Sequence, residues 1–326
     1  MKYGFKIAGI VFFIWISFTA SSQIEKGLIP WSNKLLLNPS YAGLKKDSYL
    51  WSSLQFQSQP EKNLNNTWAL TYDTWLEKME GGFSVQFYQG LEGKFNTNNT
   101  GAGFSFSKPF EAGRNGQFIP SVGLSLHTAE KQWFVHFIDR AIDRNLEHQS
   151  PPGEEFLRYS VSQPSAGLLW NSASAEIGLA GFWFLYRNYG EEEDISKQSS
   201  LFLIFHAAKK KKGNRRGLVS QPVKASPEIT LLYNKEFLIS RVGIRVDQPK
   251  SSAGLFIQNN FTGNYHGIGG VLGWKFNNLQ LNFVAGGSYS VPLKKAGFFG
   301  EASLGLTIPY IHINEKNPWA PPPRSF

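Results

Sequence analysis

The sequence predicts an all-β protein, a transmembrane antiparallel β-barrel of roughly 14 strands and of the outer-membrane type. Three observations predict this fold: an export signal, apolar–polar alternation in many short segments, and no stretch left over for a helical domain. The composition agrees with many strands and tight turns, because 15% of the 326 residues are aromatic, 32 are glycine and only 17% are charged.

The export signal occupies the start of the chain. A short basic region precedes an apolar run over residues 7–18, and small residues stand at the −3 and −1 positions before Gln23. This pattern predicts a signal peptide over residues 1–22, cleaved before about Gln23. The run is shorter than the roughly 20 apolar residues that a membrane-spanning helix needs. The chain has no cysteine, which excludes a lipid-anchored lipoprotein, disulfides and thiolate metal sites.

Alternation with a period of two residues predicts the strands. In "TWALTY" (67–72) Trp, Leu and Tyr share one face, and Thr, Ala and Thr share the other. "FFGEASLGLTI" (298–308) repeats the pattern near the C-terminus. The predicted strands cover about 48–57, 66–73, 82–88, 100–107, 118–127, 162–171, 175–186, 200–208, 226–233, 236–246, 252–259, 264–276, 278–289 and 297–309.

Two architectures share this alternation. A soluble secreted sandwich would bury the apolar faces between two sheets, and its tryptophans would suit carbohydrate binding. An outer-membrane barrel turns the apolar faces to lipid and fills its lumen with small and polar side chains. The barrel is favoured by the export signal, by polar faces of Gly, Ser and Gln, and by aromatic residues near strand ends, as in an interfacial belt. The predicted belt comprises Trp51, Trp68, Tyr88, Trp133, Trp170, Trp183, Tyr186, Trp274 and Tyr289.

The barrel prediction divides the chain into four parts. The signal peptide is followed by an N-terminal periplasmic or plug segment at 23–47, the barrel at 48–310 and a proline-rich tail at 311–326. If both ends are periplasmic, the connections 128–161 and 187–199 are extracellular. Polar side chains on the luminal faces are expected to line or block the lumen; they are Gln55, Gln57, Gln86, Arg241, Arg245, Lys275 and Glu301.

No chemical motif predicts an enzyme. The chain lacks the serine-hydrolase, zinc-protease, Walker and dinucleotide-binding signatures, and its six histidines have no metal-ligand spacing. We therefore expect no catalytic residue, cofactor, metal or nucleic acid partner. The acidic run at 191–194 fits a solvated loop or a calcium site. The basic run "KKKKGNRR" (209–216) fits a solvated hairpin tip, or a contact with lipid phosphates, a polyanion or an acidic partner.

The tail after the last predicted strand cannot form a membrane strand. Its three prolines, 321–323, impose an extended conformation and donate no ladder hydrogen bonds. Trp319 and Phe326 would be anchors for a periplasmic partner, or the tail is disordered.

A compact turn precedes the first predicted strand. Within "NKLLLNPSYAG" (33–43), proline fixes its own φ and biases the preceding residue away from helix, while glycine permits backbone angles that other residues avoid. This block, followed by "SLQFQSQ", resembles the start of the PorP/SprF family of Bacteroidetes outer-membrane proteins. The matching positions are Asn38, Pro39, Tyr41, Ala42 and Gly43, with serine in place of the family's usual alanine at position 40.

The resemblance implies a role in the type IX secretion system and gliding machinery, in the outer membrane and in contact with its lipid. Such proteins act with secreted cell-surface adhesins that bear a type-B C-terminal domain, and some link to periplasmic secretion components. The implied function is to aid export or surface anchoring of such an adhesin through protein–protein contacts. The matching block would then be a plug or clasp, or a partner contact. The alternative function is a porin that conducts small solutes.

Overall fold

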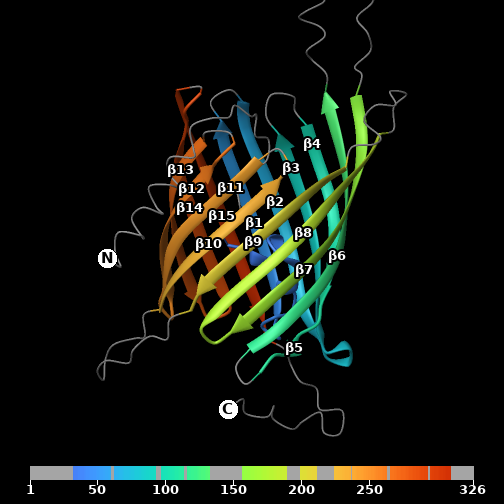
Figure 1. Ribbon diagram of the computed structural model, residues 1–326, viewed down its shortest axis with the longest axis vertical. Coiled ribbons are helices and arrows are strands. Elements are labelled where there is room, and N and C mark those ends of the chain that lie inside the picture. Colours follow the sequence, from blue (N-terminus) through green and yellow to red (C-terminus); the bar gives the residue numbers. More distant parts are fainter. Residues whose placement is uncertain are drawn as a thin grey trace, which may run out of the picture.

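The computed structural model describes residues 32–59, 62–92, 97–113, 116–132, 156–188, 199–210, 224–235, 237–262, 265–292 and 294–309. Fourteen antiparallel strands form a closed barrel, as the alternation predicts (Figure 1). The strands are β1 (Ser48–Gln59), β2 (Lys62–Leu76), β3 (Gly81–Glu92), β4 (Thr97–Ser107), β6 (Gly116–Gln132), β7 (Phe156–Ser172), β8 (Ala175–Asn188), β9 (Ser199–Lys209), β10 (Lys224–Asn234), β11 (Phe237–Asp247), β12 (Ser251–Asn260), β13 (Tyr265–Phe276), β14 (Leu279–Ser290) and β15 (Lys295–Ile308).

Closure of the barrel joins the first strand to the last. β1 and β15 pair continuously from Ser48↔Ile308 to Ser58↔Phe298, so the sheet has no open edge there. A two-residue strand that the alternation does not predict, β5 (Phe110–Glu111), pairs with β6. β4 also pairs directly with β6, which keeps the wall continuous.

Several strands extend beyond their predicted ends. β6 continues to Gln132 and β7 begins at Phe156, and these two residues pair with each other. The predicted connection 128–161 is therefore shortened to 133–155. Both 133–155 and 189–198 lie outside the described residues, as do the predicted signal peptide, most of the basic run and the predicted tail.

The two faces of the wall differ as a lipid-embedded barrel requires. On the outside, Val122, Leu255 and Ile268 are 63%, 67% and 64% exposed, although they are large apolar side chains. On the luminal face of β2, Ala69 and Thr71 are buried. Within the described residues, no helix has the length and apolar character needed to cross a membrane.

Two residues of the predicted aromatic belt point into the lumen instead. Trp51 is buried, and its ring occupies the space that a side chain at Gly305 would need. Tyr88 stacks beside His127, with ring centroids 4.4 Å apart. Both rings sit on the polar face of their strands because a glycine across the strand pair leaves room for them, at Gly305 for Trp51 and at Gly101 for Tyr88.

Candidate functional site

The block that precedes β1 lies inside the barrel. Residues 32–47, here called the luminal segment, contain two short 3₁₀ turns, η2 (Lys34–Leu36) and η3 (Pro39–Tyr41). In Figure 1 this blue segment is enclosed by the strands. Contacts with β6, β7 and β4 hold η3 against one side of the wall.

Two asparagines start the two turns. The Asn33 side chain accepts a hydrogen bond from the Leu35 amide at 3.1 Å, and the Asn38 side chain accepts one from the Ser40 amide at 2.9 Å. Pro39 occupies the first position of η3, where its missing N–H removes no hydrogen bond. The Asn-Pro pair is therefore a cap followed by a preset helical φ.

Asn38 also fixes the segment to the barrel wall. Its amide nitrogen donates to the backbone oxygens of Leu168 on β7, at 3.2 Å, and Leu179 on β8, at 3.3 Å. The side chain is fully buried. Gly167 makes the close approach possible, because a Cβ there would collide with the Asn38 oxygen and come within 2.6 Å of Ser121 Oγ.

A second set of contacts holds the segment to β2, β3, β4 and β6. Ser40 Oγ lies 2.8 Å from Ser121 Oγ, and the Ala42 oxygen accepts a hydrogen bond from Ser107 Oγ at 2.8 Å. The Gly43 amide donates to Asp73 at 3.1 Å. Gly43 has a φ of 59°, and a side chain there would lie 2.7 Å from the Thr74 oxygen, so glycine is required on two counts.

One carboxylate joins the segment to the barrel end that carries the basic run. Glu176 on β8 accepts from the Tyr41 hydroxyl and pairs with Lys34 at 2.5 Å and with Lys210 at 3.4 Å. The Tyr41 hydroxyl also lies 2.7 Å from His206 Nε2. Burial, followed by the negative charge of Glu176, raises the pKa of Tyr41 well above its ordinary value, so the phenol stays protonated and donates.

The opposite side of the lumen contacts the segment as well. Leu37 packs in an apolar cluster with Ile204, Phe237 and Ile239 from β9 and β11. The Asn33 side-chain nitrogen donates to the Thr71 hydroxyl at 2.8 Å, and the Ser32 backbone amide donates to Glu301 on β15 at 3.3 Å. The luminal segment therefore spans the lumen from one wall to the other.

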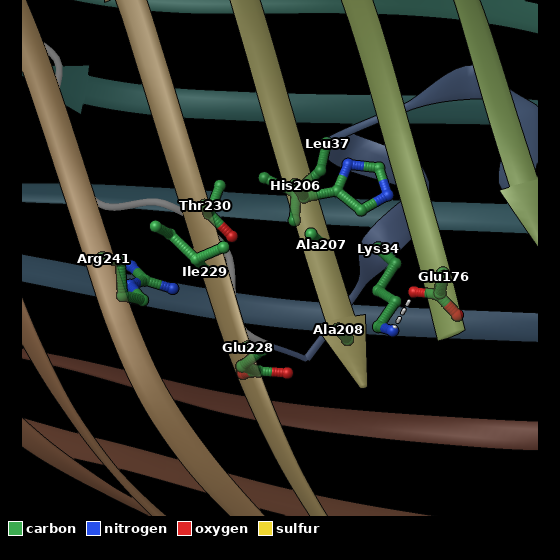
Figure 2. A pocket seen from close by; sticks show the side chains of 10 residues that line it. All are labelled: Lys34, Leu37, Glu176, His206, Ala207, Ala208, Glu228, Ile229, Thr230 and Arg241. Carbon is green, nitrogen blue, oxygen red and sulfur yellow. Dashed lines mark hydrogen bonds and ion pairs between the residues drawn. The ribbon is translucent and has the colours of Figure 1, made fainter. Parts of the chain in front are cut away.

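Two cavities flank the luminal segment. The first, about 30 Å³, is lined by charged and polar groups that include Lys34 of the luminal segment and, on β8 to β11, Glu176, His206, Glu228 and Arg241 (Figure 2). This volume holds about two water molecules. The second is about 140 Å³ and has a different lining, described below.

Comparison with known protein families identifies the family to which the chain belongs. The family model for the type IX secretion system membrane protein PorP/SprF matches residues 31–310. The chain belongs to the PorP/SprF family. It is accordingly an outer-membrane β-barrel of a secretion-system family, which is not an enzyme family. A search of curated proteins finds no match.

Several solved barrels with low sequence identity to this chain are similar to it in fold only. The CymD monoaromatic hydrocarbon channel aligns with a TM-score of 0.51 and 8% identity, over 89% of this chain and 96% of that one. CdiB from Acinetobacter baumannii aligns with a TM-score of 0.50 and 8% identity, over 80% of this chain. This PorP/SprF chain spans 60% of the length of CdiB.

The predicted luminal residues of this PorP/SprF protein bond mainly to other residues of the barrel wall, and two of them, Gln86 and Arg241, also line the cavities beside the segment. Their positions are as follows: Gln55 donates to Glu301 at 3.1 Å, Gln57 lies 3.4 Å from the Tyr265 hydroxyl, Gln86 donates to Ser125 at 2.9 Å, Arg241 donates to Gln258 at 2.9 Å, Arg245 pairs with Asp247 at 3.3 Å, and Lys275 is exposed at the end of β13. The segment reaches this group at Glu301, to which the Ser32 backbone amide donates at 3.3 Å.

Several residues that hold the PorP/SprF block were not predicted. The two-residue period predicts that Glu176 and His206 lie on the luminal faces of β8 and β9. Nothing in the sequence predicts that they contact Tyr41. The only sequence feature of Gly167 that could have indicated its role is a glycine inside a strand, which permits close approach of another segment.

In the described part of the chain, no three His, Asp or Glu side chains form a group that could hold a metal ion.

Proposed function

We propose that this PorP/SprF protein aids export or surface anchoring of a secreted adhesin through protein–protein contacts, with the luminal segment as a fixed plug. One observation carries the proposal: residues 32–47 contact opposite walls of the barrel, since Asn38 bonds Leu179 on β8 and Ser32 bonds Glu301 on β15. A segment that crosses the lumen obstructs the passage of solutes, so it favours a protein-binding function over a solute channel. The family supports a partner among secreted proteins, and the adhesin would bear a type-B C-terminal domain.

The two ends of the barrel would contact different partners. In this proposal the connections 133–155 and 189–198 seat the adhesin on the cell surface. The opposite end carries the basic run, and Lys210 at its start is paired with Glu176. That end would contact periplasmic secretion components through the basic run or the proline-rich tail. We also propose that the signal peptide is cleaved before about Gln23.

A disulfide lock tests whether the plug has to move. The chain has no native cysteine. Ser40 and Ser121 have their oxygens 2.8 Å apart, so S40C/S121C brings two sulfurs within bonding reach and ties the plug to β6. The matched control is S84C/S105C, whose oxygens are 2.6 Å apart and which joins β3 to β4 without holding the plug.

The expected result is that both oxidised variants retain a secreted adhesin at the cell surface and co-purify with it. Neither variant should give channels in a planar bilayer, oxidised or reduced. The alternative function, a porin, predicts channels in the reduced S40C/S121C protein that close on oxidation, while S84C/S105C conducts throughout. Loss of adhesin display in the oxidised S40C/S121C variant alone would disprove a fixed plug.

A further inference from the structure

The second cavity beside the luminal segment is uncharged. It measures about 140 Å³, and its floor consists of Leu35, Leu36 and Pro39. It is lined further by Gln86, Tyr88, Phe104, Ser105, Gln163, Ser165 and Phe182 from β3, β4, β7 and β8. None of these residues carries a charge, in contrast to the first cavity. Gln163 and Phe182 lie farther than Glu176 from the barrel end with the basic run, so this cavity lies toward the proposed extracellular end.

Two glutamine side-chain amides in the lining each use only one of their two polar atoms in a hydrogen bond within the described residues. Gln86 Nε2 donates to Ser125 Oγ at 2.9 Å, and Gln163 Oε1 lies 2.7 Å from His127 Nε2. Within the described residues, the oxygen of Gln86 and the nitrogen of Gln163 make no hydrogen bond. The Tyr88 hydroxyl is buried and likewise has no partner there. Buried polar groups normally have partners, so the Tyr88 hydroxyl points to a ligand that supplies one. The Gln86 oxygen and the Gln163 nitrogen belong to half-buried side chains of the same lining and are available to that ligand.

The chemistry of the lining limits the classes of ligand that the cavity could bind. An acceptor on Gln86 and a donor on Gln163 match the N–H and C=O of one peptide group. The absence of a charged residue from the lining argues against a phosphate or another polyanion. The volume is below the roughly 300–1,000 Å³ of small-molecule sites, but it has room for one large side chain over the apolar floor.

We propose that this cavity is a socket for an uncharged peptide segment of the secreted partner, which inserts one large apolar side chain from the extracellular end. The inference rests on the proposed function and identifies where that function's partner binds. Gln86 and Gln163 hold a main-chain amide of the partner, while Leu35, Leu36 and Phe182 contact its side chain. The plug then has a second role, as the floor of a binding site.

Site-specific photo-crosslinking tests the socket in intact cells. The photo-reactive residue p-benzoylphenylalanine replaces Tyr88 or, in a second variant, Gln163, both of which line the cavity. The matched control carries it at Phe87, the next residue, which faces lipid and is 49% exposed. We expect both luminal sites, but not the control, to crosslink to an uncharged stretch of a secreted protein, identified by mass spectrometry of the joined peptides.

Charge variants supply an independent readout. Q86E and Q163E place a carboxylate in the uncharged socket, and each should weaken the crosslink and the co-purification of the partner by about tenfold or more. Q280E is the control, since Gln280 is luminal on β14 but bonds Asn282 and does not line the cavity. All variants are compared as folded barrels, selected by heat-modifiable migration.

The outcomes separate the socket from the proposed function. Crosslinks at the luminal sites to lipid, to glycan or to this chain itself would overturn the socket, and so would full partner binding by Q86E and Q163E. If a secreted protein still co-purifies in those cases, the proposed function stands without the socket. If no secreted protein co-purifies with the unmodified barrel, the proposed function fails first.

Discussion

Replacing Asn38 with alanine should release the luminal segment from the barrel wall. The side chain makes three hydrogen bonds, one to the Ser40 amide and two to the oxygens of Leu168 and Leu179. At about 0.5–1.5 kcal/mol each, their loss destabilises the seated segment by about 1.5–4.5 kcal/mol. The population of the released state should then rise by a factor between about 12 and about 1,600.

The assay uses the absence of native cysteine. Ser40 is fully buried, so S40C gives a near-isosteric thiol that a water-soluble maleimide reaches only when the segment leaves its seat. The labelling rate in purified barrels should increase in N38A by the factor given above. The control is N282A, which removes a buried asparagine of β14 that bonds Ser303 at 3.3 Å, away from the segment.

The aspartate variant separates hydrogen bonding from shape. N38D keeps the acceptor for the Ser40 amide but turns an oxygen toward the oxygens of Leu168 and Leu179. It should therefore label at least as fast as N38A, although it has the shape of asparagine. Equal labelling of N38A, N38D and N282A would refute the conclusion that Asn38 fixes the segment to the wall.

Three further substitutions test other parts of the structure. G167A should also accelerate labelling, because its Cβ would lie 2.6 Å from Ser121 Oγ, whereas G287A, with its nearest atom at 4.0 Å, should leave the rate unchanged. E176Q removes the charge shared by the two paired lysines and should raise the labelling rate by about tenfold. On the lipid face, L255R should cost about 2–4 kcal/mol and lower the temperature at which the barrel loses its folded gel mobility, whereas L255A should not.

The strand alternation predicts the individual strands, because one face of each strand meets lipid and the other meets the lumen. The export signal and the small, polar faces are needed as well to favour the barrel over a soluble sandwich. The residues that seat the segment could not be predicted in the same way. Tyr41 meets Glu176 and His206 across 135 and 165 residues of chain, and no local pattern encodes such pairings. Trp51 was assigned to the wrong face because a belt position was inferred from composition, and the space beside Gly305 is visible only in the closed barrel.

The contact between Ser32 and Glu301 also bears on the order in which the protein folds. These groups are 269 residues apart, and Glu301 belongs to the last strand to be synthesised. Closing so long a loop is slow and entropically costly, so it follows the local hairpins. The contact of Ser32 with β15 is thus among the last to form, although residue 32 precedes every strand of the barrel. A seated N-terminal segment is consequently a marker of completed assembly in the membrane.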